Sequence, residues 1–238
     1  MVWRKATKLA RLLAHPGYWR GLMFGVAATL EHRAALGGLD LATVVDIGAN
    51  KGQFSLFARD AFPGARITAF EPLAEPAARF AALFAGDRRI TLHRVAIGPE
   101  RGKATIHVAA RDDSSSLLPI TERQTALYPD TRLKETRTID VAPLDAFLDA
   151  ADVAAPALLK LDVQGFELEA LKGCEALLDR FSYVYAECSY VELYTGQALA
   201  DQVVAHLAAR GFGKGGAFNL ARDADGCPVQ ADVLFTRA

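Results

Sequence analysis

The chain has 238 residues, of which 51% are hydrophobic and 23% are charged, so it is long enough for one sizeable α/β domain with short additions. Its 27 lysines and arginines nearly balance its 28 aspartates and glutamates, giving a formal net charge of -1. A near-neutral chain has no overall field to attract nucleic acid or an anionic membrane, so neither is predicted as a partner. The three cysteines are widely spaced and form no C-x-x-C pair, which argues against a disulfide framework and a zinc site and fits a cytoplasmic protein best.

Residues 1–42 are predicted to be helical, with breaks at residues 15–18 and 37–38, and to form an N-terminal cap on the main domain, residues 43–238. Leucines are mixed with lysines and arginines over residues 3–13. This pattern predicts either a helix packed across the domain with its basic face in water or a helix lying on an anionic surface. The apolar stretch over residues 21–30 is too short, and too closely flanked by charges, to be an integral membrane segment.

An apolar run over residues 44–47 carries Asp46 and leads through Gly48 and Gly52 into a helical pattern that begins at Gln53. The run predicts a buried strand, a tight turn and a helix that ends near residue 62. The glycines allow a ligand to approach the backbone closely, and the free N–H groups at the helix start suit a carboxylate or a phosphate. The motif D-x-G-A-N-x-G lacks the third glycine of G-x-G-x-x-G, which favours a ligand other than a dinucleotide; a purely structural turn is the alternative.

A second strand, predicted over residues 65–70, ends at Glu71 and is followed by a helix over residues 75–84, which completes a βαβ unit. Glu71 lies 25 positions after Asp46, at the carboxyl end of this strand. An acidic residue at this position binds ribose hydroxyls in such folds, so the same role is predicted for Glu71, with a solvated loop acid as the alternative.

The middle of the chain is predicted to hold strands over residues 90–97, 103–108 and 136–141, followed by a helix over residues 144–148. A polar stretch of about 20 residues that begins at residue 112 and contains Ser115 separates two of these strands. Connections of this length are usually lids or substrate walls, and a flexible solvated loop is the equally weighted alternative.

Three ionisable residues are predicted at the carboxyl edge of the next two strands, which span residues 157–162 and 183–189. Lys160 and Asp162 lie two positions apart and share one face of the first strand, where ligands bind in open α/β sheets. Capping of a helix over residues 166–178 is the alternative for Asp162. Glu187 can share the pocket with Asp162 or form a buried ion pair with Lys160.

The last part of the chain is predicted to form a helix over residues 199–210 and two strands over residues 218–221 and 229–236. Residues 223–226, Asp-Ala-Asp-Gly, are a strong hairpin signal between these strands. An antiparallel pair is therefore expected at one side of the sheet.

Five motifs occur in a fixed order: VVDIGANKGQFS, ITAFEP, HRVAIG, DDSSSLLP and LLKLDVQGFELEALKG. Together they resemble the FkbM family of S-adenosylmethionine-dependent methyltransferases, and the resemblance runs from about Thr43 to the end of the chain. It implies a single Rossmann-like class I methyltransferase domain, with a mostly parallel seven-stranded sheet and a C-terminal antiparallel hairpin. It also implies O-methylation of a small acceptor, commonly a sugar hydroxyl, with S-adenosyl-L-homocysteine as the product of the cofactor.

The resemblance also implies a set of cofactor contacts. The methionine part would be held by the turn, the ribose diol by the end of the second strand, and the adenine edge by the third strand. The turn residues are Asp46, Gly48, Ala49, Asn50, Gly52 and Phe54. Glu71 and Pro72 would hold the ribose, and Ala96 and Ile97 the adenine edge. Ser115 and Asp162 complete the set of cofactor contacts. Many members of the family have Glu where this chain has Gln164, which makes a carboxylate-rich metal site less expected, and no metal is predicted.

The chemistry of methyl transfer agrees with these residues. A sulfonium donor needs an anionic pocket and a carboxylate for its diol, but no grip for a pyrophosphate. Because an alcohol is a weak nucleophile, a general base would accelerate the reaction by about 10²–10⁴-fold. Asp162 is the first candidate and Glu187 the second, while Lys160 could orient Asp162 or contact the acceptor. His93, His107 and His206 are predicted to be structural.

Two other functions fit parts of the sequence. An NAD(P)-dependent oxidoreductase would use the same βαβ unit and ribose acid, but the missing third glycine and the absence of a Tyr-x-x-x-Lys pair count against it. A noncatalytic Rossmann-like binding protein would keep the fold without the chemistry.

Overall fold

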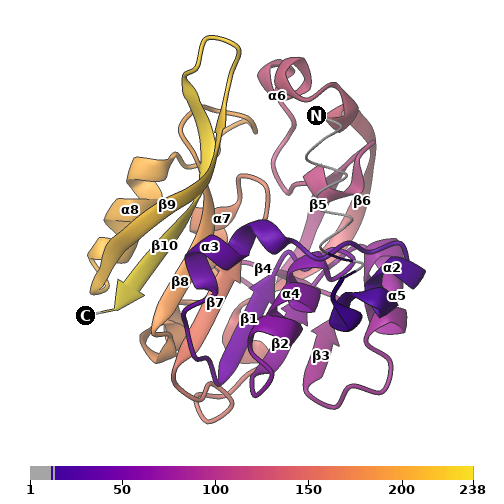
Figure 1. The fold of residues 1–238 in the computed structure, drawn as a ribbon. Coiled ribbons are helices and arrows are strands. Elements are labelled where there is room, and N and C mark those ends of the chain that lie inside the picture. The colour runs from indigo at the N-terminus through magenta and orange to yellow at the C-terminus, as the bar shows by residue number, and fades with distance from the viewer. Residues whose placement is uncertain (1–11, 13, 238) are drawn as a thin grey trace.

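The computed structural model describes residues 12 and 14–237 and is built around a seven-stranded sheet (Figure 1). The strand order is β3-β2-β1-β7-β8-β10-β9, and β10 runs antiparallel to both of its neighbours while the other pairs are parallel. The strands are β1 (Thr43–Ile47), β2 (Arg66–Phe70), β3 (Ile90–His93), β7 (Ala157–Leu161), β8 (Tyr183–Ser189), β9 (Phe212–Arg222) and β10 (Pro228–Arg237). This confirms the predicted fold, including the hairpin that closes one side.

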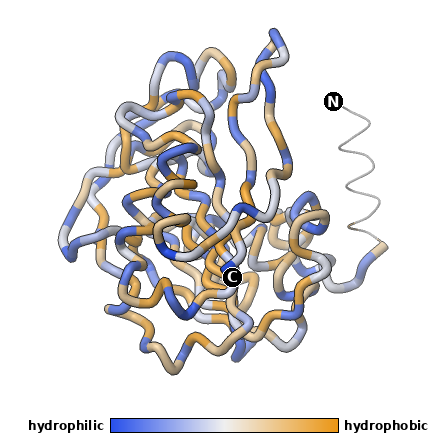
Figure 2. Tube along the Cα trace, turned by 90° about the vertical axis from the view of Figure 1, so that its left-hand side faces the viewer, coloured by the Kyte–Doolittle hydropathy of each residue, from blue (hydrophilic) through white to orange (hydrophobic). Residues whose placement is uncertain are grey.

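The described part of the N-terminal segment forms short helices. They are η1 (Pro16–Tyr18), α2 (Trp19–Met23), η2 (Leu30–His32) and α3 (Arg33–Leu36). The break predicted at residues 15–18 is a 3₁₀ turn whose buried Tyr18 donates a hydrogen bond of 2.6 Å to Asp60. The basic helix predicted within residues 3–13 lies almost wholly outside the described residues. Hydrophobic and hydrophilic positions alternate in short runs along the trace (Figure 2), and no described helix has the length and apolar character needed to cross a membrane.

A second, three-stranded sheet corrects the predicted third strand. The chain leaves the main sheet after His93, and Ala96–Ile97 forms β4, whose parallel partner is the end of β6 (Leu133–Ala142). The break is stabilised because Val95, between the two strands, is buried in the main core. β5 (Gly102–Ala109) pairs antiparallel with β6 and completes this sheet.

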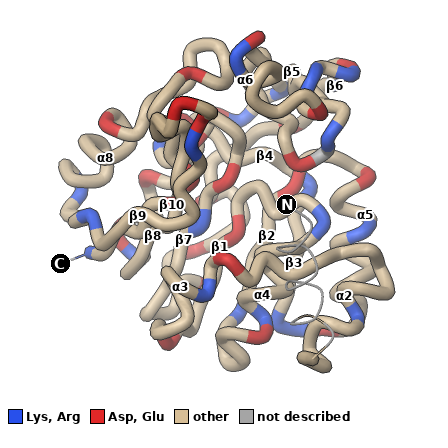
Figure 3. Tube along the Cα trace, turned by 45° about the horizontal axis from the view of Figure 1, so that its top comes forward, with Lys and Arg blue, Asp and Glu red and all other residues tan. Residues whose placement is uncertain are grey.

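The polar stretch after β5 folds into short helices and forms a polar wall beside the main sheet. It contains η3 (Asp112–Ser114), α6 (Glu122–Leu127) and η4 (Pro129–Thr131), and together with β5 and β6 it stands over one end of the main sheet (Figure 3). Thr121 caps α6 by accepting a hydrogen bond from the backbone N–H of Gln124. The hydroxyl of Ser116 donates to the carbonyl of Gln164 at 2.6 Å, which ties the wall to the turn after β7.

Helices cover both faces of the main sheet. They are α4 (Gln53–Ala61), α5 (Ala74–Leu83), α7 (Glu167–Gly173) and α8 (Ala200–Ala208). The helix predicted over residues 166–178 divides into α7 and the 3₁₀ helix η6 (Glu175–Arg180), and that over 144–148 is the 3₁₀ helix η5 (Leu144–Ala146).

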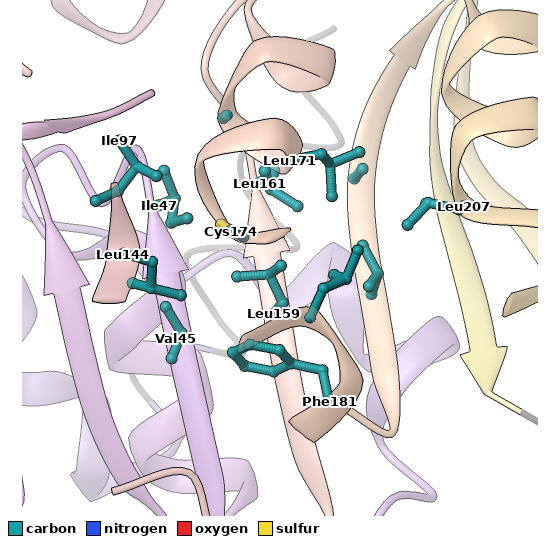
Figure 4. Packing of buried hydrophobic residues seen from close by; sticks show 14 of the residues in the cluster. Val45, Ile47, Ile97, Leu144, Leu159, Leu161, Leu171, Cys174, Phe181 and Leu207 are labelled. Carbon is teal, nitrogen blue, oxygen red and sulfur yellow. The ribbon is translucent and has the colours of Figure 1, made fainter. Parts of the chain in front are cut away.

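Alternate residues of the central strands enter different cores. Val45 packs with Leu159 and Leu171 on the α7 side (Figure 4), whereas Val44 packs with Leu158 on the side of α4 and the N-terminal helices. Strands buried on both faces are typical of a parallel sheet, and they leave polar groups only at the strand ends.

Candidate active site

A cavity lies at the carboxyl ends of β1, β2 and β7. The second sheet and the polar wall form one side, and residues of the N-terminal segment form another. Most of the predicted site residues line it: Gly48, Ala49, Asn50, Phe54, Glu71, Pro72, Ala96, Ile97, Ser115, Lys160 and Asp162. Asp46, Gly52 and Glu187 do not belong to this lining.

The glycine turn after β1 is held tightly against the end of β7. Gly48 has φ of +79°, and a Cβ atom there would lie 1.9 Å from the carbonyl oxygen of Asp162. Only glycine allows this approach. Gly52, with φ of +94°, is the N-cap of α4, and its missing Cβ makes room for the rings of Phe80 and Phe84. Gly52 therefore shapes the turn from behind the cavity wall.

Glu71 is almost fully buried at the end of β2, with 6% of its surface exposed. One carboxylate oxygen accepts a hydrogen bond from the N–H of Asn50 at 3.0 Å, and the other accepts one from the N–H of Leu73 at 2.8 Å. Burial raises the pKa of Glu71 to about 7, although the two N–H groups favour its charged form. Each oxygen keeps a further lone pair, so the carboxylate can still accept the hydroxyls of a diol.

Lys160 lies in a buried ion pair with Asp46, its neighbour on β1. The ammonium nitrogen is 3.0 Å from a carboxylate oxygen of Asp46 and donates a hydrogen bond of 3.2 Å to the carbonyl of Gly48. The second oxygen of Asp46 accepts a hydrogen bond from Ser55 at 2.7 Å. Burial alone disfavours the ammonium, but Asp46 and Asp162 outweigh it and raise the pKa of Lys160, so the side chain is charged at pH 7.

This ion pair corrects the predicted alternative in which Lys160 pairs with Glu187. The register sets the partner, because Lys160 stands directly beside Asp46 on β1, whereas Tyr185 occupies the adjacent position on β8. Asp46 is completely buried and supports Lys160 from behind the cavity wall.

Asp162 faces the cavity, and 43% of its side-chain surface is accessible. It lies 3.9 Å from the ammonium of Lys160 and accepts a hydrogen bond of 2.7 Å from the side-chain amide of Gln164. The same amide donates to Glu187 at 2.9 Å, so Gln164 bridges the two carboxylates. Burial, together with the negative charge of Asp162, raises the pKa of Glu187 well above its usual range.

Two cavity residues from the N-terminal segment were not predicted. The hydroxyl of Thr29 is buried without a hydrogen-bond partner among the described residues. His32 also lines the cavity and places Nδ1 3.1 Å from the hydroxyl of Tyr185 and 3.5 Å from Asp232. No local motif marks either residue, because each reaches the site only through the packing of residues 14–42 on the sheet.

The sequence matches the model of the methyltransferase FkbM domain over residues 46–213. The chain belongs to the FkbM methyltransferase family. Its domain is thus of the S-adenosylmethionine-dependent class, as the motifs predict, and the oxidoreductase alternative loses its support.

Named relatives agree with this assignment. The chain is 34% identical over 185 residues to the 31-O-demethyl-FK506 methyltransferase FkbM of Streptomyces tacrolimicus, covering 66% of this chain and 69% of that one. It is 28% identical over 160 residues to the 2-O-methyltransferase NoeI of Sinorhizobium fredii, covering 65% of this chain and 66%, slightly under two thirds, of NoeI. A solved structure of a putative tRNA (m1A22) methyltransferase from Streptococcus pneumoniae, Sp1610, in complex with S-adenosyl-L-methionine, shares the fold with a TM-score of 0.51 and 11% identity, covering 88% of this chain and 72% of that one.

Proposed function

We propose that the protein transfers a methyl group from S-adenosylmethionine to a hydroxyl of a small acceptor, a sugar or a glycosylated metabolite. The observation that carries the proposal is a cavity at the strand ends that is lined both by a buried carboxylate, Glu71, and by the charged pair Lys160 and Asp162. Both relatives are named as methyltransferases that act on an oxygen, and the name of NoeI specifies position 2.

Residues of the cavity offer a group for each part of the cofactor. Glu71 would accept hydrogen bonds from the ribose hydroxyls, and the apolar side chains of Val95, Ile97 and Phe166 would cover the adenine. Gln53 and Phe54 at the start of α4 line the cavity, where backbone N–H groups would suit the cofactor's carboxylate, while Asp162 would attract its ammonium group. When bound, S-adenosylmethionine supplies an electrophilic methyl group on a positively charged sulfur.

The residues around this methyl position would bind and align the acceptor. Holding an oxygen in line with the methyl group, in a site closed to water, can contribute roughly 7–11 kcal/mol. The charged Lys160 fixes the position of Asp162, and Asp46 in turn fixes Lys160. Asp46 would therefore act on the site through Lys160, as a positioning residue.

A sugar acceptor suits the polar end of the cavity. The carboxylate of Asp162 is accessible and can accept a hydrogen bond from a hydroxyl. Carbohydrate hydroxyls pair with such a group, whereas an apolar acceptor would leave it unsatisfied.

The test is a mass-spectrometric screen in which the protein and S-adenosylmethionine are incubated with nucleotide sugars, glycolipids and glycosylated metabolites. The proposal predicts a product that is heavier by one methyl group, together with release of S-adenosylhomocysteine. Methylation confined to acceptors that lack a sugar would contradict the carbohydrate assignment but retain methyl transfer. A protein that binds neither S-adenosylmethionine nor S-adenosylhomocysteine would contradict the proposal as a whole.

The prediction that Asp162 is the general base remains a prediction. Asp162 has the right location, but its carboxylate is also the neighbour of the buried ammonium of Lys160. If Asp162 accepted the proton, this ammonium would lose part of its charge compensation.

A further inference from the structure

His32 lines the cavity but is not among the predicted catalytic residues. It is supplied by η2, and its side chain is 13% exposed, so the ring is largely enclosed by protein. The rings of Phe54 and Tyr185 contact it edge-on, with centroids 5.2 and 5.4 Å away. These contacts hold the imidazole in one orientation at the wall of the cavity.

The orientation of the ring distinguishes its two nitrogens. Nδ1 faces the protein, where it approaches the hydroxyl of Tyr185 at 3.1 Å and a carboxylate oxygen of Asp232 at 3.5 Å. Nε2 has no hydrogen-bond partner among the residues that the structure describes. An imidazole held through Nδ1, with Nε2 available to a ligand, has the arrangement of a general base.

Asp232 is itself held firmly on β10. Its oxygen accepts hydrogen bonds from the side-chain amide of Asn219 at 2.7 Å and from the hydroxyl of Tyr185 at 3.1 Å. Burial would by itself raise the pKa of Asp232, but His32, Asn219 and Tyr185 outweigh it and lower that pKa. Asp232 is therefore a carboxylate at pH 7, ready to balance a positive charge on His32.

Charge balance favours His32 over Asp162 as the proton acceptor. A proton taken up by His32 creates a cation beside the carboxylate of Asp232, which is a favourable pair. A proton taken up by Asp162 removes a negative charge next to the buried cation of Lys160. Proton transfer to His32 therefore creates an ion pair with Asp232, whereas proton transfer to Asp162 weakens its ion pair with Lys160.

We propose that His32 is the general base of the methyl transfer and that Asp232 is the positioning residue behind His32. This inference rests on the proposed function. As the acceptor oxygen forms its bond to the methyl carbon, the carbon–sulfur bond breaks and its electron pair stays on sulfur. The hydroxyl proton moves to Nε2 of His32 and later leaves to water. Both residues lie outside the matched family segment, residues 46–213.

The experiment measures single-turnover methyl transfer to a methyl glycoside that the unmodified protein methylates, chosen from a panel. His32→Ala and His32→Gln are expected to lower the rate constant by about 10²–10⁴-fold. Affinity for S-adenosylhomocysteine, measured by calorimetry, should stay within about threefold, and added imidazole should restore part of the rate of His32→Ala. Asp232→Asn should lower kcat more than it raises KM.

The matched control is His206→Gln. His206 also lies near a carboxylate, with Nε2 3.8 Å from Glu175, but it belongs to α8 and does not line the cavity. Its replacement should leave the rate unchanged.

Three results would overturn the proposal. His32→Ala could keep the rate while Asp162→Asn loses it, which would make Asp162 the base. The rate and the cofactor affinity of His32→Ala could fall together without imidazole rescue, which would make His32 structural. An unmodified protein that binds S-adenosylhomocysteine but methylates no glycoside would first contradict the sugar assignment, and the role of His32 in it would fall as a consequence.

Discussion

The two ends of the cavity are built in different ways. The donor end comes largely from one stretch of chain, residues 48–97, in which a turn, a strand end and a short second strand follow one another. The opposite end combines residues 29–32 with residues 160–164 and is supported by residue 232 on β10. The donor end is therefore local in sequence, whereas the acceptor end depends on the packing of distant segments.

Removing the buried cation Lys160 should have the largest effect on stability. Lys160→Ala would leave the fully buried Asp46 without a counter-ion, which should cost about 3–5 kcal/mol of unfolding free energy. Asp162→Asn is the matched control. Because 43% of the Asp162 side chain is accessible, its loss should cost about 1 kcal/mol or less. Urea denaturation of the three proteins measures the difference, and equal losses in both variants would show that Lys160 is not specifically paired with Asp46.

The donor end should be most sensitive at its first glycine. Gly48→Ala would force a Cβ atom into the carbonyl of Asp162 at a left-handed φ, so about 3 kcal/mol or more of stability should be lost. Binding of S-adenosylhomocysteine should be lost with it. Gly64→Ala is the control, since its added Cβ would meet no atom within 4 Å, and its effect should stay within about 0.5 kcal/mol. Thermal unfolding with and without S-adenosylhomocysteine distinguishes the two, and a stable Gly48→Ala variant that binds normally would refute the close packing.

A smaller effect is expected from the pH dependence of cofactor binding at the donor end. Burial raises the pKa of Glu71 from an ordinary 4.5 to about 7, and a ribose diol donates to its charged form. The dissociation constant of S-adenosylhomocysteine should therefore rise about eightfold between pH 7.5 and pH 6. Glu71→Gln should bind more weakly at pH 7.5 and change little with pH. Calorimetry at the two pH values measures this, and an unmodified protein with constant affinity would exclude Glu71 as the titrating contact.

Protonation of Glu71 weakens cofactor binding but favours the folded state of the ligand-free protein. A raised pKa in the folded state means that the contribution of Glu71 is fully present below pH 4.5 and is lost as pH rises through 7. Glu167 has its pKa raised by burial to about 7 as well, and therefore adds to this trend. Acidification should thus weaken cofactor binding while these two groups favour the folded state.

Sequence patterns predict the donor end well for a physical reason. Gly48 and Glu71 each follow a buried strand of a βαβ unit, and parallel strands bring their carboxyl ends together without further information. The partner of Lys160 could not be chosen in this way, because it depends on the register between β1, β7 and β8. His32 could not be predicted at all, because its position at the cavity depends on long-range contacts with Tyr185 and Asp232.

The claim on which the account depends is that this cavity holds S-adenosylmethionine by its ribose through Glu71. Calorimetric titration at pH 7.5 tests it with S-adenosylhomocysteine and NADH as ligands, on the unmodified protein and on Glu71→Ala. We predict micromolar binding of S-adenosylhomocysteine, no binding of NADH and a loss of about 100-fold in affinity for Glu71→Ala. Binding of NADH without binding of S-adenosylhomocysteine, or equal affinities for the unmodified protein and the variant, would contradict it.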